Sequence, residues 1–261
     1  ELVFVCLKAC VIDAVMPDLK DLRAAGATII SYQNGLDTEG VIGEGIGDKK
    51  GVLRVVINYA GKLLDDGRVA VAFFHKPNYV GVLDPAAVPA AEKTAAAMSA
   101  AGLKAKYTDK ISRQVWEKVI LNSSMSPLSA LTRLTMAEVM ARPELVGVVE
   151  GLIHEGIEVA KSQGVDFENG FFEHCMGYLK KAGPHKPSML VDVEAGRRTE
   201  IDFLNGMIRK QGAGKVEVPY HATITALIKG VEQSILTRRV NAASEDAQRQ
   251  RPAGTLEEKK S

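Results

Sequence analysis

The first part of the chain alternates short apolar runs with a segment of helical spacing. A continuous apolar run covers residues 2–7, apolar positions recur at helical spacing over 11–25, and a second β-rich run covers 27–33 and ends at Asn34-Gly35. Continuous apolar runs of this length are typical of strands buried in a parallel sheet. The pattern therefore predicts one β-α-β unit with a right-handed crossover.

Turn residues separate the β-rich pieces that follow. These pieces cover residues 52–60, 68–74, 79–83 and 103–107, and a helix-like stretch over 85–101 precedes the last of them. Together they predict a twisted sheet that ends near residue 108. Gly43, Gly45 and Gly47 lack the G-x-G-x-x-G spacing, so we expect a flexible turn there and find no dinucleotide-binding fingerprint in the chain.

The character of the sequence changes at Ser112, because β-branched runs disappear and apolar residues recur at helical spacing. Breaks between helices are expected at Pro127, Pro143, Gly164, Gly183-Pro184, Pro187 and 212–219. The last residues are polar and nearly devoid of large apolar groups, so they cannot repay the entropy of ordering. The fold class is therefore α/β plus all-α: a sheet domain over 1–110, a helical domain over 111–236 and a disordered polar tail over 237–261.

Composition narrows the classes of partner. The 261 residues carry 33 basic and 32 acidic side chains, a net charge of +1, without a block of like charges, which does not favour binding of nucleic acid or of an anionic membrane. No apolar run reaches the roughly 18 residues of a membrane span, and no signal peptide is recognised, so we expect a cytoplasmic protein. The 3 cysteines fit neither a zinc ligand set nor a C-x-x-C motif, and no metal site is predicted.

A row of polar residues on one expected helix is the strongest candidate for chemistry. Lys118, Asn122 and Ser126 are four apart and share a helix face, whereas the positions between them are mostly apolar and can cover a core. Such a helix would hold the row rigidly. A lysine held in this way can act as an acid.

The end of the second strand is a candidate ligand edge. Asn34-Gly35 is either a hairpin turn or the carboxyl end of a strand in an α/β sheet, where ligands bind, and the segment from Thr38 has the pattern of a helix start. Lys8 ends the first strand on the same edge. It is either a cation that holds a phosphate or adenine, or a solvated lysine.

A second segment, residues 187–206, also carries candidate groups. Pro187-Ser188 has the pattern of a helix entry. Thr199 has the pattern of an N-cap for a second helix, with Glu200 in the first turn of that helix. Backbone amides and a hydroxyl at such a junction suit a carboxylate ligand. The alternative for Glu200 is a capping or ion-pair role.

These motifs together resemble the ketopantoate reductase (2-dehydropantoate 2-reductase) family over about residues 2–235. The resemblance is carried, in chain order, by Lys8, Gln33-Asn34-Gly35, Trp116-x-Lys118-x3-Asn122, Ser188-Met-Leu-x-Asp192 and Thr199-Glu200-Ile-Asp202-x2-Asn205-Gly206. It implies an N-terminal Rossmann domain, a helical C-terminal domain, an active site between them and reduction of ketopantoate to pantoate by NADPH.

The resemblance also implies roles for individual residues. Lys118 would be the catalytic acid that binds the carbonyl oxygen, and Glu200 the partner of the substrate hydroxyl. Asn34 would lie beside nicotinamide and substrate, and Lys8 would contact the adenosine end of the cofactor. The remaining substrate-binding residues would be Asn122, Ser126 and Ser188. The expected partner is a small 2-oxoacid, and a homodimer is left open.

Two departures from the family pattern stand out. Ser126 occupies a position where some members carry asparagine, and His185 lies where a further substrate-binding asparagine can occur in the family, which leaves the 2-oxoacid open. The first β-α-β portion with its glycine-rich turn is missing upstream of Glu1, so a partial, N-terminally truncated Rossmann domain with poor NADPH binding is expected. A related hydroxyacid or hydroxyacyl dehydrogenase and a non-catalytic sensor module remain alternatives.

Overall fold

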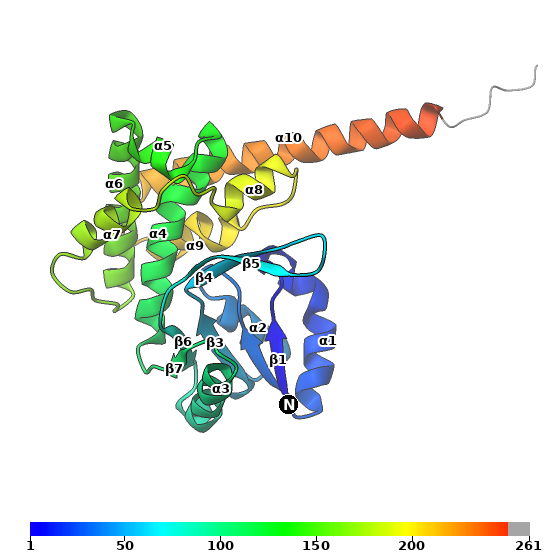
Figure 1. The fold of residues 1–261 in the computed structure, drawn as a ribbon, viewed down its shortest axis with the longest axis vertical. Coiled ribbons are helices and arrows are strands. Elements are labelled where there is room, and N and C mark those ends of the chain that lie inside the picture. The colour runs from blue at the N-terminus through cyan, green and yellow to red at the C-terminus, as the bar shows by residue number, and fades with distance from the viewer. Residues whose placement is uncertain (250–261) are drawn as a thin grey trace, which may run out of the picture.

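The structure, a computed structural model, describes residues 1–249. It consists of a sheet-containing part and a helical part, and the long last helix extends away from the body of the molecule (Figure 1). The strands are β1 (Leu2–Val5), β2 (Thr28–Ser31), β3 (Val52–Val56), β4 (Tyr59–Leu63), β5 (Val69–Phe74), β6 (Asn78–Val82) and β7 (Ala105–Tyr107). The α-helices are α1 (Ile12–Ala24), α2 (Thr38–Ile46), α3 (Val88–Ala100), α4 (Ile111–Thr132), α5 (Met136–Met140), α6 (Pro143–Ser162), α7 (Phe171–Lys180), α8 (Ser188–Glu194), α9 (Asn205–Gly212) and α10 (Pro219–Arg249).

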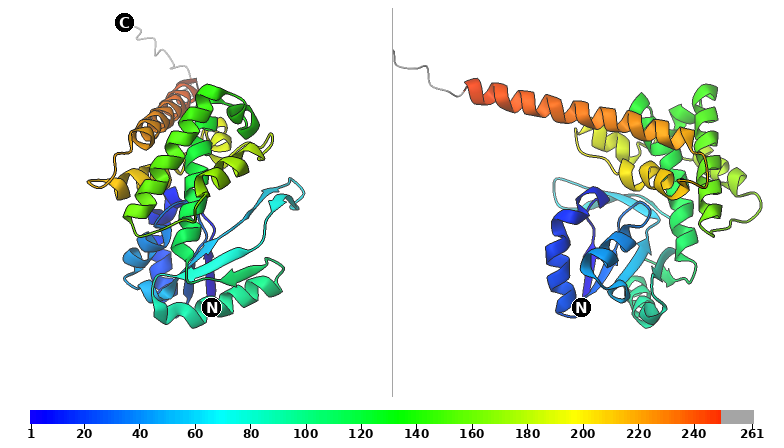
Figure 2. Two further views of the ribbon diagram at one scale, coloured as in Figure 1. Left: turned by 90° about the vertical axis from the view of Figure 1, so that its left-hand side faces the viewer. Right: turned by 180° about the vertical axis from the view of Figure 1, so that it is seen from behind.

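The main sheet has five strands in the order β1-β2-β3-β6-β7. Strands β1, β2 and β3 are parallel, β6 runs antiparallel to β3, and β7 is parallel to β6. The reversal follows from the antiparallel hairpin of β4 and β5, which is inserted between β3 and β6 and projects from the sheet (Figure 2). The expected β-α-β unit and the end of the sheet near residue 108 are confirmed.

Helices cover both faces of this sheet because successive strand residues point to opposite sides. Ile29 packs with α1 and α2 on one face, and its neighbour Ile30 packs with α3 on the other. This three-layer arrangement explains why the strands are apolar without alternation. The α/β plus all-α fold class is thereby confirmed.

Helix α4 connects the two parts of the molecule. It contacts β3 and β6 near its beginning and packs against α6, α8 and α10 further along, within the core of the helical part. The expected break at Pro127 is wrong, since this proline lies inside α4. Proline cannot donate to the carbonyl of Ser123 four residues earlier, and that carbonyl instead accepts a hydrogen bond of 3.0 Å from Nδ2 of Asn205. The tertiary contact thus compensates for the lost helix bond.

Two further expectations differ from the structure. Gly43 and Gly45 do not form a flexible turn but lie in α2, where a Cβ on Gly45 would be 2.4 Å from Sδ of Met16, so the glycine permits close packing of α2 on α1. Helix α10 continues through residues 237–249 of the expected disordered tail, because alanine, arginine and glutamine favour a helix without needing a core. The rest of that segment, 250–261, lies outside the described residues.

No helix within residues 1–249 combines the length and the apolar character that crossing a lipid bilayer requires.

Candidate functional site

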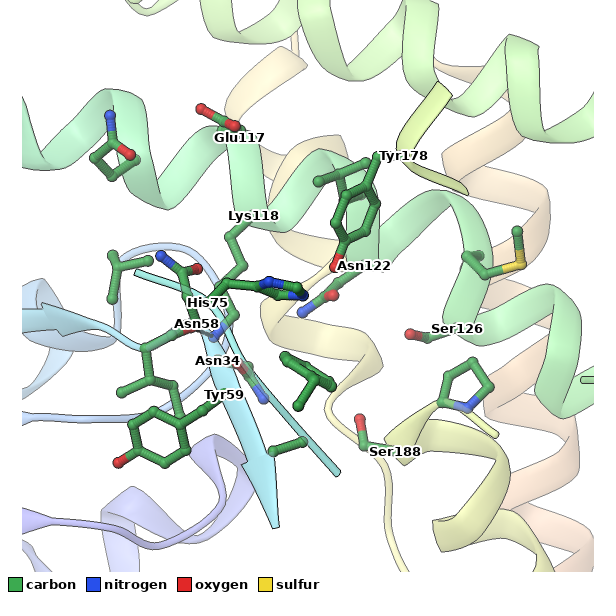
Figure 3. Close-up of a pocket in the computed structure, with 18 of the residues that line it drawn as sticks. Asn34, Asn58, Tyr59, His75, Glu117, Lys118, Asn122, Ser126, Tyr178 and Ser188 are labelled. Atoms are coloured by element: carbon green, nitrogen blue, oxygen red, sulfur yellow. Dashed lines mark hydrogen bonds between the residues drawn. The ribbon is translucent and has the colours of Figure 1, made fainter. Parts of the chain in front are cut away.

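A cavity of about 510 Å³ lies between the sheet part and the helical part. Its wall is built by the loop after β2, the β3–β4 junction, the end of β5 with the loop behind it, helix α4, helix α7 and the beginning of α8. Figure 3 shows side chains from both parts pointing into this space. The volume is within the range typical of small-molecule sites.

The polar row of α4 forms one side of the cavity. Lys118, Asn122 and Ser126 all line it, because their spacing puts them on one helix face. The opposite face is anchored by buried residues such as Val119 and Ile120, exposed by only 1% and 0%. The prediction that the helix packs on the core and presents these three side chains on one face is confirmed; the structure does not test their roles.

Lys118 is held in a desolvated position. Its Nζ donates a hydrogen bond of 2.6 Å to the backbone oxygen of Ile57, the residue that follows β3. Burial of the amine is the main cause that lowers the pKa of Lys118 to about 7, the positive charge of Arg54 lowers it further, and the negative charge of Glu200 acts in the opposite direction. This shift leaves the amine able to give or take a proton near neutral pH.

Asn34 lies at the end of β2 and reaches the same cavity. Its amide group donates a hydrogen bond to the carboxylate of Glu200, while its Oδ1 is buried without a partner among the described residues. The hairpin alternative for Asn34-Gly35 is wrong, since α2 follows after a short turn. An unpaired buried acceptor beside a cavity is a place where a ligand donor would gain a hydrogen bond.

Glu200 lies behind Asn34 and does not line the cavity. It is 8% exposed, and its Oε1 accepts a hydrogen bond of 3.0 Å from the backbone N–H of Ala9. Burial raises the pKa of Glu200, against the N–H of Ala9 and the charge of Lys8, which lower it. Thr199 caps no α-helix, because a single 3-10 turn follows it and α9 begins only at Asn205.

Lys8 and Ser188 are both placed by α8, but only Ser188 reaches the cavity. Ser188, the first residue of α8, lines the cavity. Lys8 follows β1 and lies outside the cavity, where its Nζ forms an ion pair with the buried carboxylate of Asp192, which also pairs with Arg197 at 3.1 Å. The ion pair of Lys8 ties the carboxyl edge of the sheet to the helical part.

Sequence reasoning missed Arg54, the one arginine of β3, which is 2% exposed. Its Nη2 donates to the backbone oxygen of Gly35 at 2.9 Å, and its Nη1 contacts the hydroxyl of Thr38 and lies 3.2 Å from a carboxylate oxygen of Glu39. Arg54 therefore holds the turn that presents Asn34. A charged residue in an otherwise apolar strand run was the signal that could have found it.

The hairpin and the loop behind it supply the second set of missed residues. Asn58, Tyr59, Phe73 and His75 line the cavity, although nothing in their local pattern distinguished them from an ordinary surface hairpin. Tyr178 of α7 also lines it. These positions depend on how the hairpin packs, which is a tertiary property.

Comparison with known proteins gives consistent matches along the chain. Residues 1–85 match the sequence model described as Ketopantoate reductase PanE/ApbA, and residues 110–232 match the one described as Ketopantoate reductase PanE/ApbA C terminal. A 2-dehydropantoate 2-reductase from Archaeoglobus fulgidus is 29% identical over 236 residues, which cover 90% of this chain and 78% of that protein.

Solved structures share the fold. A D-mandelate dehydrogenase in complex with NADH superposes with a TM-score of 0.80 at 25% identity and covers 90% of this chain and 79% of that one. A 2-dehydropantoate 2-reductase from Geobacter metallireducens GS-15 superposes with a TM-score of 0.79 at 24% identity, covering 88% of this chain and 77% of that one.

Proposed function

Because the chain belongs to the ketopantoate reductase family, a family of oxidoreductases, we propose that it reduces a 2-oxo acid to the 2-hydroxy acid with NADPH, with ketopantoate as the first candidate substrate. The observation that carries the proposal is the amine of Lys118. It lines a cavity together with neutral hydrogen-bonding side chains and has a pKa of about 7. That combination suits a proton donor to a carbonyl oxygen near neutral pH.

The residues around Asn34 fit the nicotinamide end of the cofactor. The cavity reaches the carboxyl end of β2, which is the edge of an α/β sheet where nucleotides bind, and the unpaired Oδ1 of Asn34 can accept a hydrogen bond from a carboxamide. The reduced nicotinamide supplies a hydride when it is bound. Lys8 is proposed as a contact at the adenosine end, supported by its place after β1 on the same edge.

Lys118 would bind the carbonyl oxygen of the substrate and deliver the proton. As the carbonyl carbon is reduced, negative charge develops on the oxygen, and a positioned ammonium stabilises it before the proton moves. Glu200 would support this through electrostatics, since its charge favours the protonated amine, and through Asn34, which it holds by a hydrogen bond. We thus assign Glu200 a supporting role and leave it without a direct substrate contact.

Neutral donors are proposed to hold the rest of the substrate. Asn122, Ser126 and Ser188 line the cavity from α4 and α8, and Figure 3 places the two serines toward the end away from Lys118. An amide and two hydroxyls can donate hydrogen bonds to a carboxylate without adding a competing charge beside the acid.

The test is replacement of Lys118 by alanine in the full-length protein, with the oxidation of NADPH as the assay and ketopantoate, other 2-oxo acids and β-hydroxyacyl compounds as substrates. Loss of the acid is expected to lower kcat by a factor of about 10² to 10⁴ with ketopantoate, while the affinity for NADPH is expected to stay nearly unchanged. Retained turnover in the variant, or reduction of none of the 2-oxo acids by the wild type, would contradict the proposal.

A further inference from the structure

One part of the cavity wall is formed by aromatic rings, in contrast to the polar row of α4. The ring wall consists of Phe73 at the end of β5, His75 in the following loop and His185 in the loop before α8, all of which line the cavity. Phe73 and His75 are stacked with centroids 5.3 Å apart, and Phe73 and His185 meet edge to face at 6.2 Å. Three segments distant in sequence thus converge into one aromatic surface.

The ring wall has uncovered faces. Phe73 is only partly buried, and His75 and His185 are exposed on the cavity side of the molecule. Tyr178 from α7 also lines the cavity with 43% of its surface exposed, and Figure 3 shows its ring directed into the same space as His75. Rings that face a cavity in this way gain by covering a planar apolar group, in stacked or edge-on contact.

The carboxylate that the family resemblance assigns to a substrate hydroxyl is not in this space. Glu200 does not line the cavity, and its oxygens are used by the backbone N–H of Ala9 and by the amide of Asn34. The part of the cavity beside the ring wall is aromatic. Among the described residues that line the cavity, the one carboxylate is that of Glu117 in α4, whose Oε1 lies 3.6 Å from Nε2 of His174. Size is no obstacle, since the cavity measures about 510 Å³.

We propose that the preferred substrates are 2-oxo acids whose carbonyl carbon carries an aromatic ring, with that ring packed on the ring wall. The inference rests on the proposed function and specifies its substrate class. In the reaction, the carbonyl carbon gains a hydride from the reduced nicotinamide, the carbon–oxygen π bond breaks, and the oxygen takes the proton of Lys118. The products are an aryl 2-hydroxy acid and the oxidised nicotinamide.

Adjacent phenylalanines in β5 provide a matched pair of variants. Phe73 lines the cavity, whereas Phe74 does not and stacks on Tyr59 with centroids 5.7 Å apart. Both are partly buried, so leucine at either position makes a similar change in volume and apolar surface. Only Phe73→Leu removes a ring from the ring wall.

The experiment compares kcat/KM for phenylglyoxylate, ketopantoate and 2-oxobutanoate in the wild type and in both variants, and measures binding of the two larger acids by titration calorimetry without cofactor. We expect wild-type kcat/KM to be about tenfold or more higher for phenylglyoxylate than for ketopantoate, and Phe73→Leu to remove most of that ratio, about 1.4 kcal/mol, while Phe74→Leu keeps it. Tighter binding of phenylglyoxylate should follow the same pattern.

The outcomes separate the two proposals. Turnover that favours ketopantoate, or an equal effect of Phe73→Leu on both acids, would overturn the aryl preference and leave the reductase proposal standing. Reduction of none of the acids, with phenylglyoxylate still bound more tightly than ketopantoate, would contradict the proposed function while supporting the aryl preference.

Discussion

Replacing Lys118 by methionine should make the folded protein more stable near neutral pH, because the wild-type amine is desolvated. The fall of its pKa from 10.5 to about 7 corresponds to about 5 kcal/mol at 1.36 kcal/mol per pKa unit. Methionine keeps the apolar stem but leaves the backbone oxygen of Ile57 without its donor, which costs about 1 to 3 kcal/mol. A net gain of about 2 to 4 kcal/mol near pH 7 follows.

The stability gained by Lys118→Met should become smaller as the pH rises. The folded-state pKa of Lys118 lies below that of the unfolded chain, so between about pH 7 and pH 10.5 the unfolded state binds more protons and wild-type stability rises with pH. The free-energy cost of burying the charged amine of Lys118 is fully present below pH 7. The advantage of Lys118→Met should therefore shrink by about 1.4 kcal/mol per pH unit above pH 7.

Urea unfolding followed by circular dichroism at several pH values measures this difference, with the exposed Lys110 just before α4 replaced by methionine as the control. The control should show no comparable trend between pH 7 and pH 9. A stability difference for Lys118→Met that stays constant over this range, or a variant less stable than the wild type at pH 7, would refute the claim that the amine is desolvated.

Two further variants should move the pKa of Lys118 in opposite directions, as read from the pH at which reduction slows. Arg54→Met removes a positive charge that lowers the pKa, so the break should move to higher pH, and Glu200→Gln removes a negative charge that raises it, so the break should move to lower pH. Gly35→Ala should cost about 1 to 3 kcal/mol in thermal unfolding, because Gly35 has a φ of +109° and an added Cβ would lie 2.7 Å from Cβ of Phe203. Movement of the pH break in the same direction in Arg54→Met and Glu200→Gln would contradict the assigned charge effects. An unchanged melting temperature for Gly35→Ala would contradict the expected strain.

The polar row of the site was predictable from spacing alone. Lys118, Asn122 and Ser126 had to share a face once α4 formed, and the apolar residues between them fixed which face turns to the core. Asn34 was predicted to lie at the ligand-binding edge of the sheet, because the carboxyl ends of parallel strands meet at one edge. Helical and strand periodicity therefore determine these positions locally.

Other parts of the site depend on contacts between segments far apart in the chain. Pro127 did not end α4 because Asn205 satisfies the carbonyl that the proline leaves free, and no pattern around residue 127 records that contact. Likewise, Phe73 and His185 form one wall only after the β4–β5 hairpin and the loop before α8 have packed. The expected role of Glu200 at the substrate stays a prediction, and its hydrogen bond from the backbone N–H of Ala9 depends on how the loop after β1 packs.

The pH dependence of kcat/KM for 2-oxo acid reduction shows whether Lys118 delivers the proton. We expect kcat/KM of the wild type to fall about tenfold per pH unit above pH 7, following the pKa of about 7, and Lys118→Met to be slow with no break at that pH. A wild-type profile that is flat through pH 9, or the same break in Lys118→Met, would contradict it.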